Sequence, residues 1–107
     1  MFNRKQYFEV SCIERKIQYD NNGYSYEYTP VSSFLQTISK CIDAYNAEYK
    51  SKFRLLILET IDRQHAHFAI VGSRRVVEGF VTAVLQTTAI SDYWAIRKIP
   101  RYMVSGE

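Results

Sequence analysis

The chain contains few glycines, prolines and cysteines, and each shortage limits its architecture. Four glycines and two prolines in 107 residues leave little material for a flexible linker between domains. The only cysteines, Cys12 and Cys41, are too few for a disulfide framework and form no metal-binding motif. Their apolar neighbours favour buried free thiols, although a single disulfide between them stays open. We therefore expect one domain over residues 1–107.

Long apolar runs are also missing. The first residues lack the apolar segment of a signal peptide, and no stretch reaches the roughly 20 apolar residues that a membrane-spanning helix needs. These absences predict a soluble, cytoplasmic protein without a membrane partner.

The composition is otherwise that of a globular protein. Hydrophobic residues make up 47% of the chain and charged residues 23%, which is enough to build a core and too apolar for a disordered chain. Nine tyrosines raise the aromatic content to 15%, and tyrosine is common both in small cores and at protein interfaces.

The first half of the chain predicts two strands and a helix. Apolar and polar residues alternate over residues 8–12, and the parity changes at residues 12–14, which indicates a bulge or a break. Asp20-Asn21-Asn22-Gly23 is typical of a hairpin turn, and residues 24–29 return as the second strand. Ser33 and Gln36 can form a capping box for a helix with an apolar stripe that runs to Tyr49.

The second half repeats this order. Residues 55–58 are apolar at every position, which predicts a central strand covered on both faces, with residues 65–71 as its partner. Ser73 can cap a second helix, in which Gly79 indicates a close crossing with another element. Ser91-Asp92 predicts a further helical turn, followed by a short tail beyond Pro100.

Together these elements predict an α+β fold. We expect an antiparallel sheet of about four strands in the order ββαββα, with two helices on one face and a short C-terminal helical or strand extension.

His65 and His67 are the first candidate site. They occupy alternate positions of a strand, so both side chains point to the same side of the sheet. This arrangement suits an acid/base pair or two metal ligands, but zinc requires a third ligand and usually a fourth, and no other histidine is present. We therefore expect no metal and no cofactor, and keep a small hydrolase or metal protein as a second alternative.

The same run resembles the signature of the histidine-triad nucleotide hydrolases, in which three histidines alternate with apolar residues. His65-Ala66-His67-Phe68 matches this pattern, and the resemblance implies that His67 would attack a phosphate. Ala69 stands where the third histidine is required, so we do not assign the chain to that family.

Two further groups of residues are candidate binding sites. Arg74 and Arg75 open the second helix, where the helix dipole and two guanidinium groups can hold an anion. The alternative is an ordinary capped helix with solvated arginines. Tyr24, Tyr26 and Tyr28 share one face of their strand, and they form either a recognition surface for protein or single-stranded nucleic acid or part of the core.

No local arrangement of nucleophile and base is recognisable, so we expect a protein without enzymatic activity. If Ala66, Phe68 and Ile70 face the helices, the opposite face of the sheet carries the histidines together with apolar residues, and an exposed patch of this kind marks an interface. We therefore predict a protein-binding module that acts through a sheet face or edge, on a partner or as a homodimer. Inhibitors, immunity proteins and phage anti-defence proteins are of this type.

Nucleic-acid binding is the main alternative. The net charge is only +3, and the basic residues form scattered pairs rather than a stripe. The residues that would contact nucleic acid, together with nearby tyrosines, are Arg74, Arg75, Arg97, Lys98 and Arg101.

Overall fold

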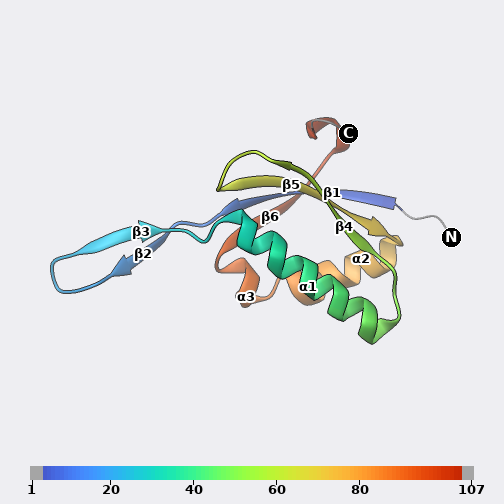
Figure 1. Cartoon of the computed structure of the whole chain (residues 1–107), viewed down its shortest axis with the longest axis horizontal. Coiled ribbons are helices and arrows are strands. Elements are labelled where there is room, and N and C mark those ends of the chain that lie inside the picture. Colours follow the sequence, from blue (N-terminus) through green and yellow to red (C-terminus); the bar gives the residue numbers. More distant parts are fainter. Residues whose placement is uncertain (1–3, 105–107) are drawn as a thin grey trace.

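A four-stranded antiparallel sheet lies at the centre of the computed structural model, which describes residues 4–104 (Figure 1). The strands follow the spatial order β4-β5-β1-β6. Helices α1 and α2 cover one face, and a separate two-stranded hairpin, β2–β3, extends from one end (Figure 1). The predicted α+β class, with four antiparallel strands and two helices on one face, is confirmed.

The order of elements along the chain is close to ββαββα but longer. The strands are β1 (Arg4–Cys12), β2 (Arg15–Gln18), β3 (Tyr24–Glu27), β4 (Arg54–Thr60), β5 (His65–Gly72) and β6 (Trp94–Ile99). The helices are α1 (Val31–Tyr49), α2 (Arg74–Phe80), the π-helix η1 (Val81–Leu85), α3 (Thr88–Ser91) and the 3-10 helix η2 (Arg101–Met103). Within residues 4–104, no helix is both long and apolar enough to cross a bilayer.

The membership of the sheet differs from the expectation. The predicted break after Cys12 is present, and it separates β1 from β2, so the hairpin leaves the main sheet. The helical turn predicted after Ser91 is wrong, because Trp94–Ile99 forms β6 and pairs with β1 from Tyr7↔Ile99 to Cys12↔Trp94. Strand β1, which lies more than eighty residues earlier in the chain, supplies the hydrogen bonds that hold β6 in the sheet. The local sequence around β6 does not indicate this distant partner.

Strand β4 lies at an edge of the sheet, so the central position predicted for residues 55–58 is wrong. Ile57 is 57% exposed, and the register shifts between Ile57 and Glu59. The run is apolar throughout because Leu55 packs against the helix-side core, while Leu56 and Leu58 pack against a second cluster on the other face. The central, fully covered strand is β5, which is buried over residues 66–72.

The main core lies between the sheet and the helices. Phe68 on β5 stacks on Phe8 of β1 at 5.3 Å and meets Phe34 of α1 at 5.4 Å between ring centroids. Val77 and Phe80 bring α2 to the same core. Ala66, Phe68 and Ile70 face the helices as predicted, because alternate residues of a strand share one face.

The N-termini of the helices test the predicted capping residues. The capping box predicted at Ser33 and Gln36 is wrong, because α1 begins at Val31, whose N–H donates to the carbonyl of Arg63 at 3.0 Å. Ser73 caps α2 as predicted, accepting a hydrogen bond from the N–H of Val76. The close crossing expected at Gly79 is also present, since a Cβ there would lie 3.2 Å from the Tyr45 hydroxyl.

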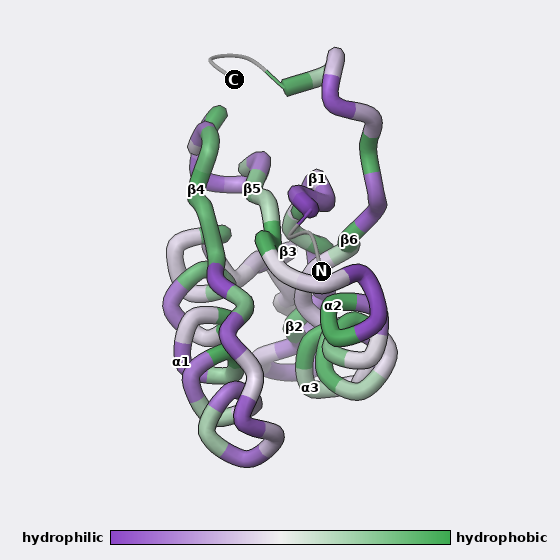
Figure 2. Tube along the Cα trace, turned by 90° about the vertical axis from the view of Figure 1, so that its right-hand side faces the viewer, coloured by the Kyte–Doolittle hydropathy of each residue, from purple (hydrophilic) through white to green (hydrophobic). Residues whose placement is uncertain are grey.

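The face opposite the helices is not the open apolar patch that we expected. Figure 2 shows α1 and α2 on one side of the sheet and the C-terminal segment on the other. There Val104 packs with Tyr7, Ala69 and Ile99, and all four residues are buried. The tail thus covers the apolar part of this face.

Candidate functional site

The β2–β3 hairpin, residues 15–27, projects from the body of the protein and is called the arm below (Figure 1). It contributes to a molecule 58 Å long and only 32 and 17 Å across. The predicted hairpin turn closes it, because the Asp20 carboxylate accepts hydrogen bonds from the N–H groups of Asn22 and Gly23 at 2.8 and 2.7 Å. The arm has no third strand beside it within the described part of the chain.

Three tyrosines of the arm are strongly exposed. Tyr19, Tyr24 and Tyr26 have relative exposures of 64%, 55% and 62%. The rings of Tyr24 and Tyr26 meet edge to face at 5.7 Å, and the Lys16 ammonium lies 4.2 Å above the Tyr24 ring. Of the predicted site tyrosines, Tyr24 and Tyr26 therefore share an exposed surface and take no part in the core.

Tyr28 departs from this surface. It lies beyond the end of β3 and is half-buried, close to where the chain re-enters the body. Tyrosines alternate in the sequence as far as Tyr28, but β3 ends at Glu27. Tyr28 therefore does not share the exposed face of Tyr24 and Tyr26.

The base of the arm is attached to the body by several contacts. The carbonyl of Thr29 accepts hydrogen bonds from the Cys12 thiol and the Trp94 indole, both at 2.9 Å. The Ile13 N–H donates to the carbonyl of Tyr93 at 3.0 Å, and the guanidinium of Arg15 lies 4.6 Å above the Tyr93 ring. These contacts fix the direction in which the arm leaves the sheet.

Both cysteines are free, as the sequence favoured, although both are half-buried rather than buried. Burial raises the pKa of the Cys12 thiol above its ordinary value, with a further contribution from the negative charge of Asp62. Cys12 therefore stays a neutral hydrogen-bond donor at the base of the arm, and its thiolate chemistry is suppressed.

His67 lies in a row of ionisable side chains across the face opposite the helices. Its Nε2 is 3.0 Å from a Glu9 oxygen, and its Nδ1 is 3.9 Å from a Glu59 oxygen. Arg97 Nε donates to the other oxygen of Glu9 at 2.8 Å. His67 is only 6% exposed, so the row joins β4, β5, β1 and β6 through a buried imidazole.

His65 has different neighbours. It points to the same face as His67, as predicted, but its Nδ1 lies 3.0 Å from the carboxylate of Asp62 in the preceding turn. Among residues 4–104, no three side chains of the metal-binding types come together. The two histidines thus have separate carboxylate partners and form no shared centre.

The pKa of the Glu9 carboxyl is lowered from its ordinary value of 4.5, chiefly by the hydrogen bond from Arg97 and next by that of His67. Because the folded-state pKa is the lower one, the ionised Glu9 carboxylate and its hydrogen bonds stabilise the fold above pH 4.5. This stabilisation is lost as the pH falls through the folded-state pKa.

We expect Glu9→Gln to remove this acid-sensitive component. The unfolding free energy, measured by urea denaturation from pH 7 to pH 3, should fall less steeply below pH 4.5 in Glu9→Gln than in the unchanged chain. Arg97→Met should flatten the same part of the curve, because it removes the largest cause of the shift. Superimposable pH profiles for all three proteins would contradict this account of the row.

Arg74 and Arg75, the second candidate site, have different surroundings in the structure. Arg74 Nε donates to the Glu78 carboxylate one turn later at 2.9 Å, while Arg75 is exposed. Ser73 already satisfies the N–H of Val76. The unfavourable position of Arg74 near the positive end of the helix therefore has a local compensation in Glu78.

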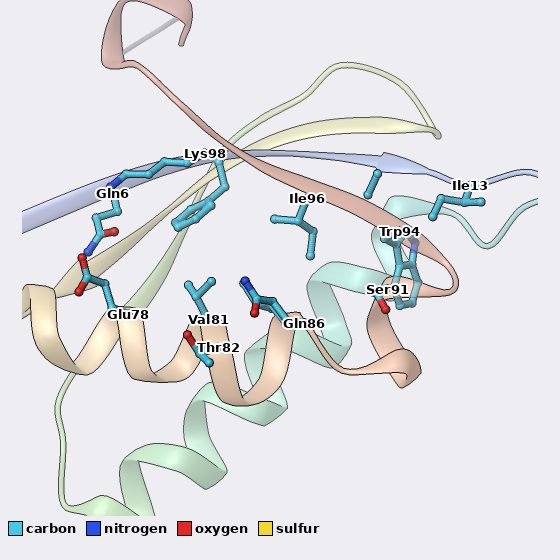
Figure 3. Close-up of a pocket in the computed structure, with 13 residues that line it drawn as sticks. Gln6, Ile13, Glu78, Val81, Thr82, Gln86, Ser91, Trp94, Ile96 and Lys98 are labelled. Atoms are coloured by element: carbon cyan, nitrogen blue, oxygen red, sulfur yellow. The ribbon is translucent and has the colours of Figure 1, made fainter.

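A cleft between the sheet and α2–η1 was missed by the sequence reasoning (Figure 3). Side chains of β1 and β6 form one wall, and those of α2 and η1 form the other. The alternation of Trp94, Ile96 and Lys98 was the only signal for the β6 wall. This alternation alone does not show which face of the sheet the three residues share, because the face is set by the pairing of β6 with β1.

Comparisons with protein-family models, curated proteins and solved structures gave no match. The functional argument therefore rests on the arm and the cleft.

Proposed function

We propose that the protein is a non-enzymatic protein-binding module and that the arm is its contact surface. The observation that carries this proposal is the projection of Tyr19, Tyr24 and Tyr26 into solvent on a hairpin that leaves the main sheet. A core function for these rings would require them to be covered, and within residues 4–104 they are not.

Tyrosine is well suited to such a contact. Its ring supplies a large apolar area, its hydroxyl forms a hydrogen bond, and it has few rotatable bonds to immobilise on binding. Tyrosines are also common among the few interface residues that supply most of the binding free energy. Tyr24 and Tyr26 present this chemistry side by side, with Lys16 holding one of the rings.

The attachment of the arm supports the same function. A two-stranded hairpin is marginally stable in water when isolated, so an arm without anchoring would be ordered only at a cost to binding. The contacts of Thr29 with Cys12 and Trp94 fix its base, and the Asp20 turn closes its tip. A partner would therefore meet a surface that is already shaped.

The charge of the arm favours a protein partner over a nucleic acid. Residues 15–27 hold two basic and two acidic side chains, Arg15, Lys16, Asp20 and Glu27, and a phosphate backbone needs a net positive surface. Elsewhere, Arg74 and Arg97 are already bonded to carboxylates. We therefore propose a partner protein with a groove of mixed apolar and polar character, as an inhibitor, immunity protein or phage anti-defence protein would occupy.

A double substitution of the arm tests this function. Tyr24→Ser/Tyr26→Ser should weaken binding of the partner by at least about tenfold, because two exposed aromatic contacts are lost. The partner is first identified by affinity capture from the source cell, and the dissociation constant is then measured by calorimetry with purified proteins. Tyr102→Ser is the matched control, since Tyr102 is 87% exposed and lies outside the arm.

Equal affinities for the arm variant and the unchanged chain would contradict the proposal. A dimer in light scattering that the double substitution dissociates would identify the partner as a second copy of the chain. Salt-sensitive retention of an oligonucleotide, with no protein captured, would favour nucleic-acid binding instead.

A further inference from the structure

The cleft between the sheet and α2–η1 has the dimensions of a ligand site. Its volume is about 770 Å³, within the range of roughly 300–1,000 Å³ that is usual for small-molecule sites. It follows β6 from Trp94 at one end to Lys98 at the other (Figure 3). Its lining mixes polar side chains with apolar ones, among them Phe8, Val81 and Ile96, which offer a surface to an aliphatic chain.

One end of the cleft is polar. Figure 3 shows Gln6, Lys98 and Glu78 together at this end. Gln6 is only 8% exposed, and its Nε2 is buried without a hydrogen-bond partner. A buried amide donor left unpaired is unfavourable, and an acceptor on a ligand would satisfy it.

The charges at this end select the kind of acceptor. Within residues 4–104, Lys98 forms no ion pair, whereas Glu78 is bonded to Arg74 at 2.9 Å. An ammonium group and an amide N–H₂ group are therefore both offered to the occupant, and the nearby carboxylate already has a cation. Such a pair of donors complements a carboxylate.

The helical wall supplies an independent indication. Residues 81–85 form a π-helix directly after α2, and Val81, Thr82 and Leu85 of this segment line the cleft. π-helical turns are rare and occur frequently at functional sites, because they turn side chains out of the regular helical register.

We propose that this cleft binds an aliphatic carboxylate, with its carboxylate group at Gln6 and Lys98 and its chain over Phe8, Val81 and Ile96. This carboxylate is a small-molecule ligand and is distinct from the protein partner proposed for the arm. This inference does not depend on the function of the arm, because none of the residues that hold the ligand belongs to it.

The chain carries its own reporter for the test. Trp94 is the only tryptophan and lines the cleft, so its fluorescence should change when the cleft is filled. We expect a saturable change with decanoate at concentrations below micelle formation. Decanol, which lacks the carboxylate, should bind at least about tenfold more weakly.

Two substitutions identify the polar end. Lys98→Met and Gln6→Leu should each lower the affinity for decanoate by about tenfold and leave the affinity for decanol unchanged. Gln6→Leu should unfold at the same or a higher temperature than the unchanged chain, since the lost amide group has no partner. Lys40→Met, on the exposed side of α1, removes the same charge and should bind decanoate normally.

Three results would overturn the proposal. The first is the absence of saturable binding of decanoate in both fluorescence and calorimetry. The second is unaltered decanoate affinity in both Lys98→Met and Gln6→Leu, or equal affinities for decanoate and decanol. The third is about tenfold tighter binding of an apolar tripeptide with a free C-terminal carboxylate, which would make a peptide end the occupant.

Discussion

Phe68→Ala is expected to lower the free energy of unfolding by about 3–5 kcal/mol. Phe68 is fully buried at the centre of β5, where its ring contacts those of Phe8 and Phe34 at 5.3 and 5.4 Å. The substitution leaves a cavity that three elements border, and none of them can move inward without losing its other contacts. A loss of this size approaches the total stability of about 5–15 kcal/mol that is usual for a domain.

Urea denaturation monitored by the fluorescence of Trp94 measures the effect. Ile57→Ala is the control, because Ile57 is 57% exposed on the edge strand β4 and should cost about 0.5 kcal/mol or less. If Phe68→Ala does not fold, the milder Phe68→Leu should still cost about 1.5 kcal/mol. Equal losses for Phe68→Leu and Ile57→Ala would show that the ring cluster is not the centre of the core.

Gly72→Ala is expected to destabilise the fold by about 2–3 kcal/mol, although it adds only one methyl group. A Cβ at Gly72 would lie 2.5 Å from the Cβ of Phe53 and 3.3 Å from its Cα. Phe53 cannot move away freely, because its ring is buried against those of Phe80 and Tyr45 at 4.9 and 5.5 Å. The end of β5 must therefore shift away from the segment that leads into β4.

Gly79→Ala is the matched control for this effect. Its added Cβ would meet only the Tyr45 hydroxyl at 3.2 Å, and this far end of the side chain needs to move by only a few tenths of an ångström. Replacing glycine within a helix also gains about 1 kcal/mol, so the net change should be close to zero. Both variants are compared by urea denaturation, and a larger loss in Gly79→Ala than in Gly72→Ala would refute the packing argument.

Three signals carried by neighbouring residues were accurate. The Asp20 turn, the Ser73 cap and the break after Cys12 are all present, because each depends on hydrogen bonds or parity within a few residues. The capping box at Ser33 failed although it is also local. The carbonyl of Arg63, which is distant in the chain, binds the N–H of Val31 and lets the helix begin earlier.

Signals that depend on burial were weaker guides. The apolar run at residues 55–58 suggested a central strand, but the C-terminal tail covers its second face at the edge of the sheet. The tyrosine alternation predicted a shared face and left open whether that face was core or surface. The departure of β2 and β3 from the main sheet decided this, because it removed the layer that would have covered Tyr24 and Tyr26.

The sequence by itself determined the α+β class, the two principal helices, the hairpin and the pairing of β4 with β5. These follow from periodicity, from turn chemistry and from contacts between segments that are near one another in the chain. Only the tertiary structure decided the pairing of β6 with β1, the exposure of the arm, the burial of His67 between two carboxylates and the existence of the cleft. Each of these depends on which distant segment covers a given face. The periodicity of a sequence indicates which side chains share a face, but not which segment packs against that face.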